Sequence, residues 1–348
     1  MSLAAVLRAV DLHQELLRIS VATAGNDHRL GANEAPPAIV SVFLGEDLEG
    51  VLESIANGTR LDNLSNVKMD MANGIIPAFK KDKTDRNRTS PFAFTGNKFE
   101  FRMLGSASSI SDTNVMINTI VADVFSEFAD RLEKAEDFDS EVNTIIKETV
   151  NTHRRIIFNG DGYSHEWEEE AERRGLLNLR STVDALPLLK SEKNIELFEK
   201  HGVFTRSEIN SRIEIILENY TKIVHIEALT LIDMMTREVI PTISAYTDKL
   251  CQTLINKNKI GGVDGLVEKE LIARLAAAER EIFTLTNELK NVVATSERTT
   301  DIFEKSVLYH DSVLRIMGDI RKYADSAECV VPAEIWPYPS YGELLFNI

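Results

Sequence analysis

A helical hydrophobic period that runs through the second half of the chain, with few breaks, limits the possible folds most strongly. Its longest stretch covers residues 205–256 and opens with a Thr205-x-x-Glu208 capping box. Its apolar stripe contains Ile209, Ile213, Ile216, Tyr220, Ile223, Leu231 and Met234. Proline lacks the backbone N–H and clashes with the preceding turn, so we expect Pro241 to kink or interrupt this helix.

Similar periods predict helices over most of the chain that follows residue 112. They cover residues 112–134, 139–158, 164–174, 264–295 and 298–325. Because the connections around residues 258–265 and 299–300 are short, the last three helices are expected to form an up-down-up bundle.

The first part of the chain mixes helices with strands. Residues 4–20 and 46–56 have helical spacing, and Gly25-Asn26-Asp27 is typical of a turn that ends the first helix. The apolar run 38–44 predicts a buried strand, whereas the polar stretch 57–84 predicts a long loop. The fold class is therefore α+β, with antiparallel strands and helices first and a mainly helical part after them.

Composition excludes several classes of protein. The 348 residues carry a formal net charge of −16, which argues against a nucleic-acid partner. No apolar run reaches 18 residues, so no membrane span is expected. We expect a cytoplasmic location. Only Cys251 and Cys329 occur; we expect both to be buried thiols outside any disulfide framework.

Two polar segments form the candidate site, namely residues 26–34 and residues 85–102. Within residues 97–103 the pattern alternates, so that one strand face holds Phe99, Phe101 and Met103 and the other holds Lys98, Glu100 and Arg102. Such a face is more often simply solvated. However, Arg29 and Arg88 lie in the same two segments, and arginine forks beside a single glutamate suit an anionic substrate held next to a metal ion.

Familiar catalytic signatures are missing from the sequence. It has no P-loop, no Gly-x-Gly-x-x-Gly, no His-Glu-x-x-His and no Gly-x-Ser-x-Gly motif. Asn159-Gly160-Asp161-Gly162 lacks the spacing of a calcium loop and is interpreted as a turn. Among the histidines, His28 alone lies in the candidate loop.

Three stretches resemble type III glutamine synthetases: LLRISVATAGNDHRLGANEAPPAIVSVFLG, DRNRTSPFAFTGNKFEFRML and WPYPSYGELLF. The similarity continues through NGDGYSHEWEEEAERRGLLNL and covers essentially the whole chain. It implies the C-terminal half of a synthetase catalytic domain at 1–135, a helical C-terminal extension at 136–330 with a long bundle, and a docked tail at 331–348.

The resemblance also implies a role for each matching residue. The substrates would be L-glutamate, ammonium and ATP, with Mg²⁺ or Mn²⁺ as the metal ion. Arg29 and Arg102 would bind glutamate, and Glu34 would lie on a flap and help deprotonate ammonium. Arg88 would stabilise the transferred phosphoryl group and Lys98 would contact ATP. Glu100 would be a metal ligand.

Two departures from the shorter bacterial synthetases accompany this likeness. Ala93 stands where they carry another phosphate-contacting arginine, and the loop between Arg29 and Glu34 is one residue shorter. A lone Glu100 cannot satisfy the coordination of two or three cations, so the chain alone is expected to be inactive without an upstream metal-binding region.

The resemblance further implies a homo-oligomeric ring. Two other hypotheses stay open: a helical oligomerisation or interaction module without chemistry of its own, and a different carboxylate-phosphorylating ligase on the same scaffold.

Overall fold

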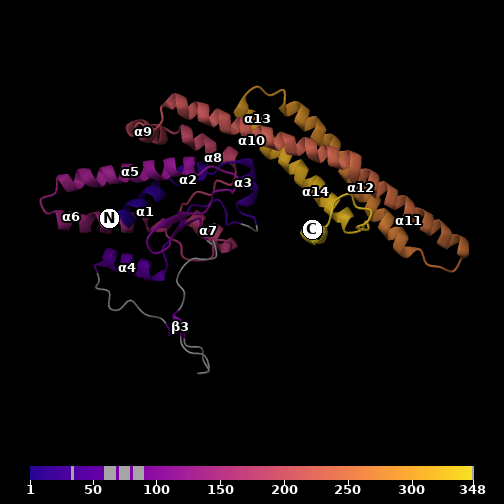
Figure 1. Cartoon of the computed structure of the whole chain (residues 1–348), viewed down its shortest axis with the longest axis horizontal. Coiled ribbons are helices and arrows are strands. Elements are labelled where there is room, and N and C mark those ends of the chain that lie inside the picture. Colours follow the sequence, from indigo (N-terminus) through magenta and orange to yellow (C-terminus); the bar gives the residue numbers. More distant parts are fainter. Residues whose placement is uncertain (33–34, 59–67, 70–78, 81–89, 347–348) are drawn as a thin grey trace. The chain divides into compact units, whose positions relative to one another are not determined.

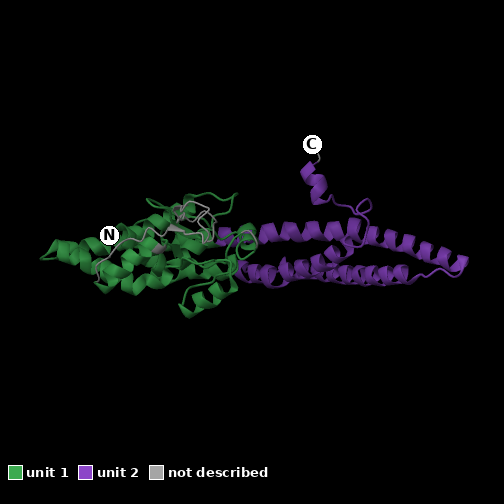
Figure 2. Ribbon diagram, turned by 90° about the horizontal axis from the view of Figure 1, so that it is seen from below, with its two compact units in different colours: residues 1–213 green, residues 214–348 purple. Residues whose placement is uncertain are grey.

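The computed structural model describes residues 1–32, 35–58, 68–69, 79–80 and 90–346. It divides into two compact units, residues 1–213 and residues 214–348 (Figures 1 and 2). None of the described helices is both long enough and apolar enough to cross a membrane.

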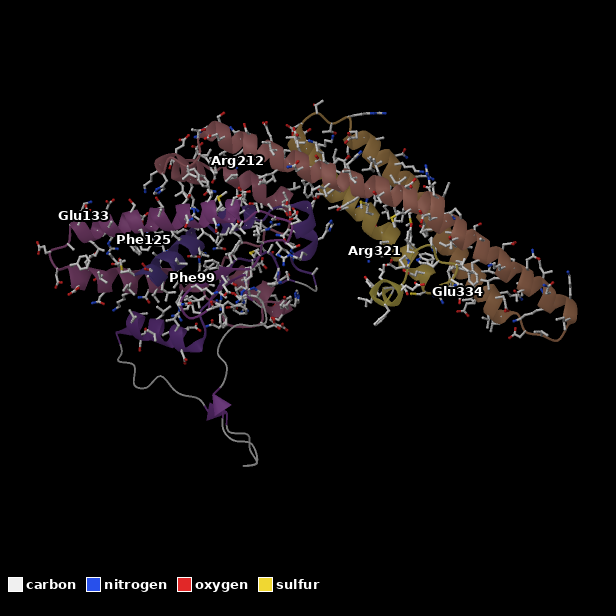
Figure 3. All side chains as sticks on the ribbon, in the orientation of Figure 1. Phe99, Phe125, Glu133, Arg212, Arg321 and Glu334 are labelled. Atoms are coloured by element: carbon white, nitrogen blue, oxygen red, sulfur yellow. The ribbon has the colours of Figure 1, made fainter. Side chains whose placement is uncertain are left out.

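Unit 1 consists of helices and a small sheet. The helices are α1 (Ser2–Leu12), α2 (Gln14–Ile19), α3 (Ala24–Arg29), α4 (Glu46–Asn57), α5 (Ser111–Glu133), α6 (Phe138–His153), the 3₁₀ helix η1 (Arg154–Ile156), α7 (His165–Arg173), α8 (Thr182–Ala185), the 3₁₀ helix η2 (Leu186–Lys190) and α9 (Glu192–Lys200). Helix α1 packs against both α5 and α6, and Figure 3 locates Phe125 and Glu133 along α5.

Apolar side chains from three of these helices form the core between them. Leu7 of α1, Ile120 and Phe128 of α5, and Ile145 of α6 are all at most 1% exposed. Each such side chain contributes about 1.5–3 kcal/mol through removal from water.

The N-terminal segment differs from its prediction in two ways. The helix expected over 4–20 breaks at His13, and all six residues of α2 are buried. The turn expected at Gly25-Asn26-Asp27 is wrong, because these residues lie within α3. The Thr23 side chain caps this helix by accepting a hydrogen bond from the Asn26 backbone N–H at 3.2 Å.

A three-stranded sheet lies beside these helices, with the order β1-β4-β5. Its strands are β1 (Val42–Phe43), β4 (Phe92–Phe94) and β5 (Phe99–Phe101). β4 and β5 are antiparallel as expected, but β1 runs parallel to β4 because the chain between them includes the crossover helix α4. Both predicted strands, 38–44 and 97–103, are longer than the observed ones.

Aromatic side chains on one face of the sheet support the predicted alternation. The Phe92 and Phe99 rings stack with centroids 5.1 Å apart, and Phe101 meets Phe92 edge-on at 5.9 Å. Within the stretch predicted to be a loop, β2 (Lys68–Met69) and β3 (Phe79–Lys80) form a separate antiparallel pair.

Unit 2 contains most of the long helices. The helices of this unit, long and short, are α10 (Arg206–Met234, which begins in unit 1), the π-helix η3 (Met235–Val239), α11 (Ile240–Ile260), α12 (Leu266–Ser296), α13 (Ile302–Leu308), the π-helix η4 (Tyr309–Val313), α14 (Leu314–Glu328) and α15 (Tyr341–Phe346). The predicted capping box before α10 is confirmed, since Glu208 accepts from the Thr205 N–H at 2.8 Å and Thr205 Oγ1 accepts from the Glu208 N–H at 3.3 Å.

The predicted interruption near Pro241 is also confirmed. A π-helical turn, η3, ends two residues before the proline and separates α10 from α11. The proline ring would clash with the carbonyl group four residues earlier, that of Arg237, and the wider π turn accommodates it.

Helix α12 packs against both α11 and α14, as the predicted bundle requires. Leu275, Ile282 and Leu289 lie seven residues apart along α12 and are at most 1% exposed. Ile316 and Ile320 of α14 are fully buried as well. A seven-residue apolar repeat of this kind keeps one face of a helix toward its neighbours.

Three further expectations concern unit boundaries, cysteines and the tail. Helices α6 to α9 belong to unit 1, so the expected boundary at residue 135 does not coincide with a boundary between compact units. The expectation of buried thiols is wrong for Cys329, which is exposed, and Cys251 is only partly buried.

Val331 at the start of the tail is buried, but α15 has no buried residue, so docking of the tail remains a prediction.

Candidate active site

The polar face of β5 is an ion-paired row. Arg102 Nη2 and Nε donate to Glu100 Oε2 at 2.9 and 3.2 Å, and Lys98 Nζ lies 3.1 Å from Glu100 Oε1. Thr95 Oγ1 also donates to Glu100 Oε1, at 3.2 Å. The alternation predicted from the sequence therefore brings Lys98, Glu100 and Arg102 together.

Cations on both sides fix the charge of the glutamate. The Arg102 guanidinium, followed by the Lys98 ammonium, lowers the pKa of Glu100 from its ordinary value of 4.5 to about 2. Glu100 is therefore ionised at neutral pH, which is the state that a divalent cation requires of a carboxylate ligand.

Arg29 reaches the same strand from the end of α3. Its Nη2 donates to the backbone carbonyl of Met103 at 2.6 Å, and its Nε donates to Asn26 Oδ1 at 2.9 Å. Met103 directly follows Arg102, so Arg29 binds the residue next to the other predicted glutamate-binding arginine.

The remaining predicted site residues are not covered by the described part of the chain. Glu34 and Arg88 fall within residues 33–34 and 81–89, which lie outside the described residues. The base of the Glu34 loop is described: Leu30 and Ala35 form a β-bridge, and the Gly31 N–H donates to the Ala35 and Pro36 carbonyls at 3.2 and 3.0 Å. Gly31 has a φ of 76°, a conformation that favours glycine.

Ala93, the noted departure, lies on β4 directly opposite Glu100. It is completely buried. Because the alanine side chain is small and uncharged, Glu100 pairs with Lys98 and Arg102 and not with a cation on β4.

A metal ion is only partly accounted for by these residues. Among the described residues, no group of three or more His, Cys, Asp or Glu side chains could hold one. Glu100 fits as one oxygen ligand, because it is ionised and partly exposed.

The sequence did not single out the contacts that fix α3. Arg18, at 1% side-chain exposure, donates to Asp27 Oδ1 at 2.6 Å and to the Leu179 carbonyl at 2.7 Å. Asp27 Oδ2 accepts from the Thr182 backbone N–H at 2.6 Å. Helix α3, which carries Arg29, is thereby tied to residues 179–182.

A separate pocket of about 470 Å³ lies within unit 2, between α10 and the connection from α12 to α13. Three of its lining residues belong to a network around the neighbouring Tyr309: Glu297 Oε1 accepts from the Tyr309 hydroxyl and pairs with Lys305 Nζ, both at 2.8 Å, and His225 Nδ1 lies 2.7 Å from the Tyr309 hydroxyl oxygen. Burial and the neighbouring Glu297 carboxylate raise the pKa of Tyr309, so its hydroxyl stays protonated. This network links three helical segments of unit 2.

Comparison with known proteins gives a consistent family. A family model described as "Glutamine synthetase C-terminal domain" matches residues 141–258. A glutamine synthetase of Butyrivibrio fibrisolvens is 39% identical over 354 residues, which cover 99% of this chain and 50% of the relative. The type-3 glutamine synthetase of Dictyostelium discoideum is 38% identical, over 99% of this chain and 48% of its own length.

A third relative, a glutamine synthetase of Bacteroides fragilis, is 35% identical over 98% of this chain and 49% of its own length. The chain thus spans about half the length of the curated relatives it matches. It belongs to the glutamine synthetase family and corresponds to the C-terminal part of these relatives.

Proposed function

We infer that this chain forms part of a glutamine synthetase that joins ammonia to L-glutamate at the expense of ATP. The observation that carries this proposal is that Arg102 pairs with Glu100 while Arg29 binds the backbone carbonyl of Met103, the residue next to Arg102. One guanidinium beside an ionised carboxylate, with a second bound to the adjacent backbone, suits a dicarboxylic amino acid held next to a divalent cation.

The reaction has two steps. A γ-carboxylate oxygen of glutamate attacks the γ-phosphorus of ATP, so that ADP leaves and a γ-glutamyl phosphate forms. Ammonium then loses a proton, and the ammonia nitrogen attacks the acyl carbon. The carbon–oxygen bond to phosphate breaks, and glutamine and inorganic phosphate are released.

The protein contributes mainly position and charge to this chemistry. In our assignment, Arg29 and Arg102 bind the glutamate carboxylates, Lys98 and Arg88 contact ATP and the transferred phosphoryl group, and Glu34 accepts the proton of ammonium. Glu100 is one ligand of a Mg²⁺ or Mn²⁺ ion, which when bound supplies positive charge to the phosphates.

The proposal includes the dependence of this chain on further residues. Glu100 by itself leaves most of the coordination shell of a divalent ion unfilled. We therefore expect the 348-residue chain alone to form no glutamine, and the ring assembly and cytoplasmic location of the full enzyme to follow the family. Glutamine formation by the isolated chain would contradict this part.

The direct test replaces Glu100 with Ala in the full-length enzyme and measures glutamine formation and oligomer size. We expect the rate to fall roughly 10²-fold or more while assembly is unchanged, because a charge at the reacting phosphates is lost. Glu148→Ala is the matched control, since Glu148 is also partly exposed and paired with an arginine, Arg131, at 2.7 Å. Normal activity of Glu100→Ala would exclude the assigned site.

A second candidate function is an interaction module in the helical part. It is favoured by exposed apolar side chains along one face of α10, namely Ile215, Ile223, Ile226 and Leu229, which are 42–63% exposed. Exchange of Ile226 for Lys should reduce oligomer size without changing the rate per active site if this face only mediates assembly. Testing other carboxylic amino acids with ATP separates a glutamine synthetase from a related ligase.

A further inference from the structure

One buried side chain, that of Asn26, links Arg29 to the backbone carbonyl of Met103, the residue after Arg102. It is 3% exposed and lies in α3, three residues before Arg29. Its Nδ2 group donates to the Val21 carbonyl at 2.8 Å and to the Met103 carbonyl at 3.0 Å, while its Oδ1 accepts from Arg29 Nε. Every polar atom of the Asn26 amide is thus used.

These three bonds also fix which way the amide faces. Reversing it would direct the NH₂ group at the Arg29 N–H and the oxygen at two carbonyl groups, leaving donor against donor and acceptor against acceptor. A carboxylate in place of the amide would likewise face the two carbonyl oxygens. An asparagine fits these neighbours, whereas an aspartate or an apolar residue of similar size does not.

The Met103 carbonyl is the shared point of this arrangement. It accepts from Asn26 Nδ2 at 3.0 Å and from Arg29 Nη2 at 2.6 Å. The residue before it is Arg102, whose own backbone N–H donates to the Pro91 carbonyl at 2.7 Å and holds the chain beside β4. The position of Arg29 relative to Arg102 therefore depends on two links to the Met103 carbonyl, one directly from Arg29 Nη2 and one through the Asn26 amide.

We propose that Asn26 is a positioning residue that sets the separation of the Arg29 and Arg102 guanidinium groups and thereby the affinity for glutamate. This inference rests on the proposed function, since it takes both arginines as the glutamate-binding pair. Asn26 acts through Arg29 and does not touch the reacting atoms. A side chain at 26 that cannot accept from Arg29 Nε removes one of the two hydrogen bonds that orient this guanidinium and leaves only the bond from Nη2 to the Met103 carbonyl.

The test measures KM and kcat of the full-length enzyme with glutamate and with ATP varied separately, for Asn26→Leu and the smaller Asn26→Ser. We expect KM for glutamate to rise roughly 10- to 100-fold, the size typical of one lost hydrogen bond to a charged group. KM for ATP should stay within about twofold of wild type, because Lys98 and the ATP contacts do not depend on Asn26.

Two further variants separate positioning from a loss of stability. Thr23→Ala removes the cap of the same helix but leaves the Asn26 amide in place, so it should lower the melting temperature without raising KM for glutamate. In an Arg29→Met background, Asn26→Leu should cause no further rise in KM, because its effect passes through Arg29.

The outcomes are distinct. Unchanged KM for glutamate in Asn26→Leu and Asn26→Ser, or additive effects of Asn26→Leu and Arg29→Met, would overturn the positioning role while leaving the proposed function intact. A rise in KM with Thr23→Ala equal to that with Asn26→Leu would also overturn it. Absence of glutamine formation by the wild-type full-length enzyme would instead overturn the proposed function and the substrate named here.

Discussion

Glu100 is held as an anion by its neighbours on the strand. Arg102 provides the largest part of this effect and Lys98 the next, and together they lower the pKa of Glu100 to about 2. A lowered carboxylate pKa gives stability that is present above the ordinary value of 4.5 and is lost as the pH falls through about 2. The ion-paired row should therefore stay intact throughout the neutral and mildly acidic range.

The titration of Glu100 tests this arrangement. In a carboxyl-carbon NMR titration we expect Glu100 to remain ionised at pH values where ordinary glutamates are half protonated. Arg102→Gln should move its midpoint toward 4.5, and Lys98→Met should move it less, following the order of the two causes. A wild-type midpoint near 4.5 would show that the row is not formed in solution.

Sequence alternation was enough to predict which side chains share this face, since successive residues of a strand point to opposite sides. It could not identify Asn26. The bond from Asn26 to the Met103 carbonyl joins residues 77 apart in the chain, and no local pattern reports such a pair. Similarly, the roles proposed for Glu34 and Arg88 rest on the family resemblance alone.

At the scale of elements, helix α3 illustrates why local preference fails near the site. Asparagine and aspartate favour turns because their side chains compete with the hydrogen bonds of the helical backbone. Glycine favours turns because, without a side chain, its backbone is less restricted. Here Asp27 is bound by Arg18 and by the Thr182 N–H, and Asn26 is bound by Arg29. Tertiary bonds use the side chains that would otherwise form a turn.

The turn at Asn159 provides an element-scale prediction. Asn159 Oδ1 accepts from the Leu44 and Gly45 backbone N–H groups at 2.9 and 2.8 Å, just before α4 begins. Asn159→Ala leaves both donors without this partner, and each buried donor left unsatisfied costs about 1–3 kcal/mol. We therefore expect a loss of about 2 kcal/mol or more in the free energy of unfolding, measured by urea denaturation.

The matched control for that measurement is Asn143→Ala. Asn143 lies exposed on α6 and donates to Asp139 of its own helix at 3.0 Å. It should change the free energy of unfolding by less than about 0.5 kcal/mol. Equal effects of the two substitutions would mean that Asn159 does not tether α4.

At the scale of the whole molecule, the two compact units have separate cores. Ile120 in unit 1 and Leu289 in unit 2 are both fully buried. Replacement of either by Ala should cost about 2–5 kcal/mol, because a large side chain leaves a cavity. By hydrogen exchange we expect Ile120→Ala to lower protection within residues 1–213 and Leu289→Ala within residues 214–348. Loss of protection across both units from one substitution would contradict independent cores.

The helical bundle of unit 2 was predictable because its apolar repeat persists over many turns, as the stripe Leu275, Ile282 and Leu289 shows. The extent of unit 1 was not predictable in this way. Helices α8 and α9 fall in a stretch, residues 175–204, for which no helix was predicted, and their burial depends on contacts with α2 and α5 far earlier in the chain. Short helices of this kind are stabilised by packing more than by their own periodicity.

The central claim is that Arg29, Glu100 and Arg102 form one substrate and metal site. A crystal structure of the full-length enzyme with L-glutamate and Mn²⁺, recorded with anomalous scattering from manganese, measures it directly. We predict a manganese peak at coordination distance from the Glu100 carboxylate and glutamate carboxylates hydrogen-bonded to Arg29 and Arg102. Manganese bound away from Glu100, with glutamate in contact with neither arginine, would contradict the account.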